Sequence, residues 1–106
     1  MQTPTTFRKK PVDIQAMQWT APEQAAALVA WAASTDPARP VHYDPNGPGP
    51  VDPATGDPWG RLSVQTLETG DDPHLATPGD WLIRGVKGEF YFCKPDIFEA
   101  TYDRVA

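Results

Sequence analysis

Hydrophobic and polar residues alternate along several short segments of the chain, with the period of two that is typical of β-strands. In the first segment, Val12, Ile14 and Ala16 lie on one face. The same alternation recurs in the second half of the chain. It predicts strands at Val12–Trp19, Arg61–Glu68, Trp81–Arg84, Glu89–Lys94 and Glu99–Arg104. We expect that the first and last of these strands can pair.

One helix is predicted between the first two strands. The stretch Thr20–Glu23 has the form of a capping box, in which the Thr20 hydroxyl and the Glu23 carboxylate satisfy two backbone donors at a helix start. Apolar residues then recur every three or four positions, at Ala25, Leu28, Val29 and Ala32. This spacing predicts a helix over Pro22–Ala33 that ends before Pro37.

Turn residues separate the strands of the second half. Gly70–Pro73 is expected to turn the chain. In Thr77–Asp80, a Pro-Gly pair occupies the central positions of a type II turn, which needs a fixed negative φ followed by a positive one. Gly85–Gly88 is expected to close a hairpin, with Gly88 in the left-handed position. Pro95 then suits the first position of one helical turn.

Proline and glycine dominate the segment between the helix and the second strand. Ser34–Gly60 contains seven of the 13 prolines and four of the eight glycines. Proline lacks a backbone donor and resists both helix and strand. We therefore expect a surface loop inserted at residues 34–60, dispensable for folding and anchored to the core by Trp59. Met1–Thr6 is polar and without pattern, and is expected to be a flexible terminus.

The predicted elements follow the order β-α-β-β-β-short helical turn-β. This order indicates an α+β fold, in which one main helix covers a bent, mostly antiparallel sheet or a small open barrel. A chain of 106 residues fits a single domain over residues 1–106. Domains typically have about 100–150 residues, and a chain of this length is too short to bury two independent cores.

Composition and charge narrow the range of functions. The net charge of −5 argues against broad binding of nucleic acid or anionic lipid, because neutralising phosphates requires clustered Lys and Arg. The single cysteine, Cys93, excludes an intramolecular disulfide and a Cys-rich zinc site. No stretch approaches the roughly 20 apolar residues of a membrane span, and none follows Arg8–Lys10 as a signal peptide requires. We expect a soluble cytoplasmic protein.

Residue types that often carry catalysis or bind metals lack the spacing that such sites need. His42 and His74 lie in separate segments expected to be loops, and neither has a second nitrogen ligand nearby. Cys93 has no evident base and is interpreted as a small core residue. Four oxygen-bearing loop residues miss the spacing of a calcium site and are interpreted as solvating the loop. They are Asp44, Asn46, Asp52 and Asp57. We predict no metal, cofactor or catalytic residue.

The hairpin carries the best candidate binding site. Its basic groups can bind an anion while its rings stack on a base, or the two together can hold an acidic partner segment. The candidate residues are Trp81, Arg84, Lys87, Tyr91 and Lys94. The simpler interpretation, which we favour, is that the rings fill the core and the basic groups are solvated at the hairpin tip.

Aromatic residues at the successive positions 90, 91 and 92 place rings on both faces of the predicted sheet. One helix can shield only one face. The second face is then covered either by the Pro-rich loop or by another copy of the chain, and we expect a homo-oligomer.

Two segments of the chain resemble known proteins. The first is FRKKPV at Phe7–Val12, leading to AMQW at Ala16–Trp19. The second is PGDWLIRGVKGEFY at Pro78–Tyr91, leading to CKPDIFE at Cys93–Glu99. Both are similar to a family of small proteins encoded by tailed bacteriophages and prophages. The resemblance implies a phage origin and a place in the cytoplasm of the infected bacterial host. The family carries no established activity, so no catalytic or binding residue is transferred.

Three hypotheses of function follow. The leading one is a non-enzymatic phage accessory protein that binds a host or phage macromolecule. The second is a protein that sequesters a small nucleotide-like ligand and so counters host defence. The third, an enzyme, has the least support from the motifs. A deep pocket containing Arg84 or Lys87 would favour ligand capture, and a flat exposed aromatic patch would favour protein binding.

Overall fold

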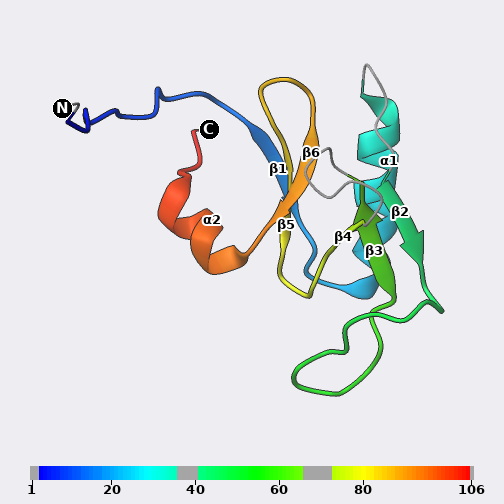
Figure 1. The fold of residues 1–106 in the computed structure, drawn as a ribbon. Helices are drawn as coiled ribbons and strands as arrows, with labels where there is room; N and C mark the ends of the chain where they lie inside the picture. The colour runs from blue at the N-terminus through cyan, green and yellow to red at the C-terminus, as the bar shows by residue number, and fades with distance from the viewer. Residues whose placement is uncertain (1–2, 36–40, 66–72, 106) are drawn as a thin grey trace.

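The structure, a computed structural model, describes residues 3–35, 41–65 and 73–105. Within these residues the chain forms two three-stranded antiparallel sheets and two α-helices (Figure 1). The first sheet has the strand order β1-β5-β6, and the second has the order β2-β3-β4. The predicted α+β class is confirmed, and the two described sheets do not close into a barrel.

The first sheet contains β1 (Gln15–Gln18), β5 (Trp81–Arg84) and β6 (Phe90–Cys93). The predicted hairpin joins β5 to β6, and its Gly85 amide donates to the Glu89 carbonyl at 2.8 Å. Gly88 adopts a φ of +80°, the left-handed conformation expected of it. β1 is shorter than predicted because its register pairs Gln15 with Arg84, the last residue of β5 before the turn.

The second sheet contains β2 (Val41–Asp44), β3 (Arg61–Val64) and β4 (His74–Leu75). β2 lies inside the segment predicted to be a loop, so that prediction is wrong at these four residues. Val41 is buried in the core, and Tyr43 packs against it. The prolines flank this short alternation without interrupting it, and their density masked the strand in the sequence.

The strand β4 was not predicted from the sequence. It has only two residues, too few to show a periodic pattern, and it is defined by its pairing with β3. Residues 66–72 lie outside the described residues. They include the end of the predicted second strand and most of the predicted turn at 70–73.

The main helix begins with a 3₁₀ turn, η1 (Pro22–Gln24), and continues as α1 (Ala25–Ser34). The predicted capping box is one residue out of place. Pro22 takes the first helical position, so Ala21 is the N-cap, and the side chain that reaches back belongs to Gln24. The Thr20 backbone amide donates to Gln24 Oε1 at 2.7 Å, in place of a bond to the predicted Glu23 carboxylate.

The predicted strand at Glu99–Arg104 is wrong, because the chain remains helical through α2 (Pro95–Thr101). Phe98 and Tyr102 are four residues apart, so their rings lie on one side of the helix, 5.0 Å apart. This helical spacing outweighs the alternation seen in the sequence. Accordingly, the strand that pairs with β1 is β5 and not the C-terminal segment.

The core lies between the two sheets and α1. Trp19, Leu28, Leu62 and Leu82 are fully buried there. The Trp19 ring meets the Trp59 ring edge-on at 5.1 Å. Trp59 is only 6% exposed, which confirms the prediction that it anchors the end of the loop. Among the described residues, neither helix has the length and apolar character that a bilayer crossing requires.

Candidate functional site

The first sheet presents its two faces to different surroundings. The register places Ile83 between Ala16 and Tyr91, so these three side chains share the face that looks away from the core. We call this the outer face. The α2 helix lies over part of it: the Trp81 ring stacks on the Phe98 ring with centroids 4.1 Å apart and an interplanar angle of 7°. A second helix therefore shields the face that sequence reasoning left for the loop or for another copy.

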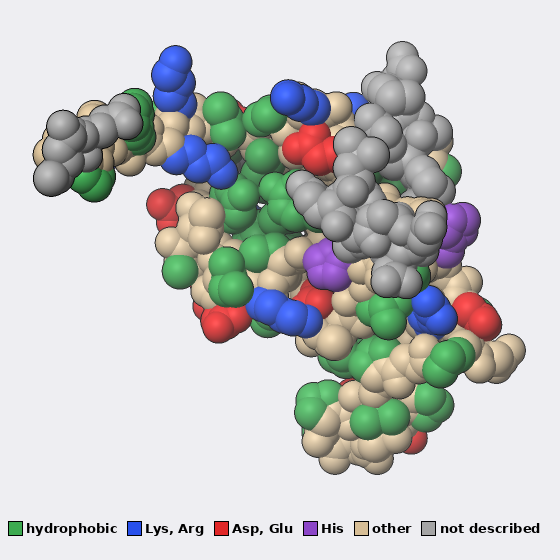
Figure 2. Space-filling view, in the orientation of Figure 1, with side chains coloured by type: hydrophobic (Ala, Val, Ile, Leu, Met, Phe, Trp, Pro, Cys, Tyr) green, Lys and Arg blue, Asp and Glu red, His purple; other side chains and the backbone are tan. Residues whose placement is uncertain are grey.

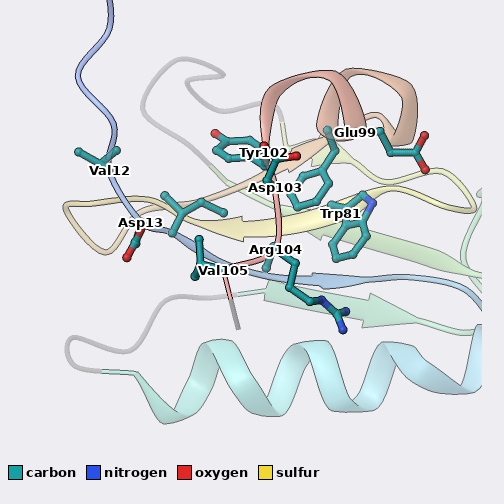
Figure 3. A pocket seen from close by; sticks show the side chains of 11 residues that line it. Val12, Asp13, Trp81, Glu99, Tyr102, Asp103, Arg104 and Val105 are labelled. Carbon is teal, nitrogen blue, oxygen red and sulfur yellow. The ribbon is translucent and has the colours of Figure 1, made fainter.

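The cover provided by α2 is incomplete, and a hollow of about 560 Å³ remains beside it. Val12–Ile14, Ala16 and Trp81 form one side of the hollow, and residues of α2 and of the segment after it form the other. We call this hollow the outer groove. Figure 3 shows Val12 and Asp13 toward one end of it and Trp81 and Glu99 toward the other.

Aromatic rings and aliphatic side chains share the lining of the outer groove with four charged residues. The half-buried rings of Trp81, Phe98 and Tyr102 line it. At its margin Val12 and Val105 are 48% and 80% exposed. On the face shown in Figure 2, hydrophobic side chains gather between α2 and the strands of the first sheet. A hollow lined by aromatic rings together with a few polar groups is a common form of binding site.

Charge is unevenly distributed around the outer groove. Three carboxylates line it, those of Asp13, Glu99 and Asp103, against the single guanidinium of Arg104. All four residues are exposed. The lining of the groove therefore favours cationic groups over anionic ligands such as nucleotides, because opposite potentials are complementary across a binding surface.

The five predicted site residues are divided among different surroundings. Trp81 lines the outer groove. Lys87 is exposed at the hairpin tip and is not among the residues lining either described hollow. The ammonium group of Lys94 is already engaged: it donates to Thr77 Oγ1 at 2.7 Å and lies 3.1 Å from Oδ2 of the buried Asp80. A Lys94 held in this way has little capacity to bind an external anion.

Arg84 lies beside a smaller, shallow hollow of about 360 Å³, formed with Asp13–Gln15 and the hairpin glycines. Its Nε atom is buried and has no hydrogen-bond partner among the described residues. The hollow contains one basic and one acidic side chain, those of Arg84 and Asp13. This is not the deep basic pocket that ligand capture would require.

Tyr91 lies on the outer face next to the groove. Burial, followed by a hydrogen bond to Tyr102, raises the pKa of the Tyr91 hydroxyl above its usual value. The hydroxyl therefore remains protonated at neutral pH. It is able to donate a hydrogen bond but does not supply charge.

Cys93 and the two histidines, which were also considered as candidate site residues, belong to strands of the two sheets. Burial, followed by the carboxylates of Asp80 and Asp96, raises the pKa of the Cys93 thiol, which makes it a poor nucleophile. Both histidines lie in strands, contrary to the loop prediction: His42 in β2 and His74 in β4, where the His74 ring meets the Phe92 ring at 5.5 Å. Among the described residues, no group of three or more His, Cys, Asp or Glu is placed to hold a metal ion.

Asp52 organises the loop, a role beyond the solvation predicted for it. Its carboxylate accepts hydrogen bonds from the amides of Ala54 and Thr55 and from the Trp59 indole at 3.3 Å. The two backbone bonds contribute most to lowering the pKa of Asp52. This carboxylate thus links the turn at residues 52–56 to the buried Trp59.

Sequence reasoning missed most of the outer groove. Phe98 and Tyr102 were divided between a helical turn and a strand, although their separation of four residues is a helical signal. Val105 gave no signal, because the opposite side of the groove, formed by Val12–Ile14, Ala16 and Trp81, is distant from it in the sequence.

Comparisons with known proteins add no further constraint on the site. The chain matches no protein-family model, no curated protein and no solved structure.

Proposed function

We propose that this chain is a non-enzymatic accessory protein of a tailed bacteriophage, acting in the cytoplasm of the infected host by binding a host or phage protein through the outer groove. The observation that carries the proposal is the combination of accessible aromatic surface and acidic margin in one hollow. Apolar area favours association, and the charged margin selects among partners.

The chemistry of the groove defines the partner. Its rings and valines suit an aromatic or aliphatic side chain, and its carboxylates suit Lys or Arg beside that side chain. The occupant is therefore a protein segment with an apolar anchor and adjacent basic residues. Arg104 adds one donor that such a segment can satisfy with a backbone carbonyl or a carboxylate.

Capture of a nucleotide is the second candidate function, and one observation favours it. The buried Nε of Arg84 lacks a partner among the described residues, and a bound phosphate oxygen would satisfy it. Against this, Lys94 is bound to Asp80, and Lys87 lies at the hairpin tip. We therefore place protein binding first.

The proposal is tested by capture on the immobilised protein, with both the proteins and the small molecules retained from host lysate identified by mass spectrometry. We expect a protein that wild type retains and that Val105→Asp loses, because the aspartate places a charge on the apolar margin. Val51→Asp is the matched control, since Val51 is 54% exposed but lies in the loop, where it pairs with Pro58, and does not line the groove. Retention should also fall as salt rises.

Two results would contradict the proposal. The first is a captured protein that Val105→Asp and Val51→Asp retain equally, because binding would then occur outside the groove. The second is a retained nucleotide that Arg84→Gln loses and Val105→Asp keeps, which would establish ligand capture beside the hairpin.

A further inference from the structure

The N-terminal segment leaves the molecule as an extended arm. Residues Thr3–Pro11, which we call the arm, are all exposed and carry no helix or strand, and Phe7 is 88% exposed. Figure 1 shows the arm running from the start of β1 away from both sheets. A large aromatic side chain held in water on an extended segment lacks the burial that would stabilise it in a single chain.

The arm has the chemistry that the outer groove selects. Phe7 is followed directly by Arg8, Lys9 and Lys10. All 14 acidic residues of the chain lie outside the arm, beginning at Asp13. Figure 2 shows basic side chains along the arm on the same molecule that carries the acidic, apolar hollow. One chain thus contains a basic aromatic segment and an acidic aromatic groove, both accessible.

An arm is poorly placed to enter the groove of its own chain. Val12–Ile14 form one side of that groove, so the arm emerges from its margin. Folding back would require a tight turn at Lys10–Asp13. Such a turn would contain Lys10, which could then no longer face the acidic margin, and it would move Val12 and Asp13 out of the groove that they line. The arm of another copy can enter the groove without this turn and without displacing Val12 and Asp13.

We infer that the arm of one copy docks in the outer groove of a second copy, and that two copies exchange arms as a symmetric dimer. The inference deepens the proposed function and rests on the outer groove being a protein-binding site. Phe7 of the arm contacts the rings of Trp81, Phe98 and Tyr102, and the three basic side chains face the acidic margin. Each chain has one arm and one groove, so a two-fold arrangement satisfies both.

Reach is compatible with this exchange. Nine extended residues span roughly 30 Å at about 3.3–3.6 Å per residue. That length is comparable with the shorter dimensions of the molecule, 35 and 33 Å. An arm can therefore cross to a groove on an adjacent copy without any change to the sheets.

The first test is the mass in solution. Light scattering of the full chain at micromolar concentration should give roughly 23 kDa, twice the 11.6 kDa of one chain. Phe7→Ser and Val105→Asp should each shift the mass toward that of one chain, and Val51→Ser should leave it unchanged. These three side chains are exposed, so the variants should fold, which near-ultraviolet circular dichroism verifies.

A charge exchange makes the test specific. One variant reverses the arm (Arg8→Glu, Lys9→Glu, Lys10→Glu), and another reverses the groove (Asp13→Lys, Asp103→Lys). Each alone should be monomeric, because arm and groove then carry like charges. Mixed in equal amounts they should form a heterodimer, since each arm meets a groove of opposite charge. Loss of folding cannot produce this rescue.

The outcomes separate this inference from the proposed function. A monomer at every concentration, a dimer that persists in Phe7→Ser and Val105→Asp, or a failed rescue overturns arm exchange. In each case a peptide of residues 3–11 is titrated into the full chain, and Trp fluorescence is recorded. Peptide binding that Val105→Asp abolishes leaves the groove as a protein site and the proposed function intact. Absence of peptide binding, together with a monomeric chain, removes the arm as an occupant of the groove, and the lysate capture with Val105→Asp and Val51→Asp then decides the proposed function separately.

Discussion

At the scale of single residues, Asp80, the buried charged residue of the described structure, stabilises a turn of the fold. Asp80 is 1% exposed, and its carboxylate accepts hydrogen bonds from the amide and hydroxyl of Thr77 and from Lys94. The Asp80 amide donates in turn to the Thr77 carbonyl at 3.0 Å, closing the predicted turn, in which Gly79 has a φ of +89°. This network holds the start of β5 against the end of β6.

Removal of the buried carboxylate should destabilise the fold more than removal of its cation. Asp80→Ala should lower the free energy of unfolding by about 3 kcal/mol, because it leaves the Thr77 amide and Lys94 without their acceptor. Lys94→Ala should cost about 1 kcal/mol, since Lys94 is partly solvated and Thr77 still satisfies Asp80. Urea denaturation measures both, with the exposed Lys87→Ala as the control. Equal losses for Asp80→Ala and Lys87→Ala would contradict this account.

The raised pKa of Cys93 predicts slow alkylation. A raised pKa lowers the thiolate fraction at any pH below it, and only the thiolate reacts. At about pH 8, iodoacetamide should modify native Cys93 several-fold more slowly than the same cysteine in urea. The rate should rise as pH increases through the raised pKa. Asp96→Asn should accelerate the native reaction, because it removes one of the two carboxylates that oppose the thiolate. A native rate equal to that in urea would exclude the shift.

At the scale of elements, the Pro-rich segment has two parts with different roles. β2 and Trp59 belong to the core, whereas residues 45–58 between them form an exposed loop with an isolated bridge between Val51 and Pro58. The ends of this loop meet, because a Cβ built on Gly60 would approach the Pro45 Cα to 2.9 Å. Because β2 and Trp59 belong to the core, we expect only the middle of residues 34–60, and not the whole segment, to be dispensable for folding.

Two replacements separate these parts. A four-residue Gly/Ser turn in place of Asn46–Pro58 should retain a cooperative thermal transition and cost roughly 1–2 kcal/mol, because Trp59 loses its bonds to Asp52 and Pro50. The same turn in place of Val41–Trp59 should abolish the transition, because it removes an entire strand and a core tryptophan. If the longer replacement also melts cooperatively, β2 is not required for the fold.

At the scale of the whole molecule, the two sheets share one core around Trp19. This residue follows β1 of the first sheet, and its ring contacts Tyr43 and Trp59 beside the second. Its amide and carbonyl also bond to Asp80 and Gly79, at the start of β5. A side chain that contacts both sheets makes their unfolding mutually dependent.

Truncation of Trp19 should weaken both sheets together. Trp19→Ala should lower the free energy of unfolding by about 3–5 kcal/mol, the usual range for a buried tryptophan. Trp81→Ala, which truncates a half-buried ring on the outer face, should cost about half as much. Far- and near-ultraviolet circular dichroism should report one coincident transition in each variant. Separate transitions for Trp19→Ala would show that the sheets fold independently.

The sequence by itself determined the local structure of this protein. The helix, the hairpin at Gly85–Gly88, the turn at Thr77–Asp80 and the α+β class follow from periodicity and from the backbone preferences of Gly and Pro, which act over a few residues. Where competing local signals overlapped, as at Glu99–Arg104, alternation was misread as a strand.

Only the tertiary structure decided which segments meet. The pairing of β1 with β5 joins residues more than 60 positions apart, and the outer groove combines Val12, Trp81 and Val105. Likewise, the ion pair between Lys94 and Asp80 and the placement of β2 in the core depend on long-range contacts. Such contacts are set by burial and register across the whole chain, so no local pattern encodes them.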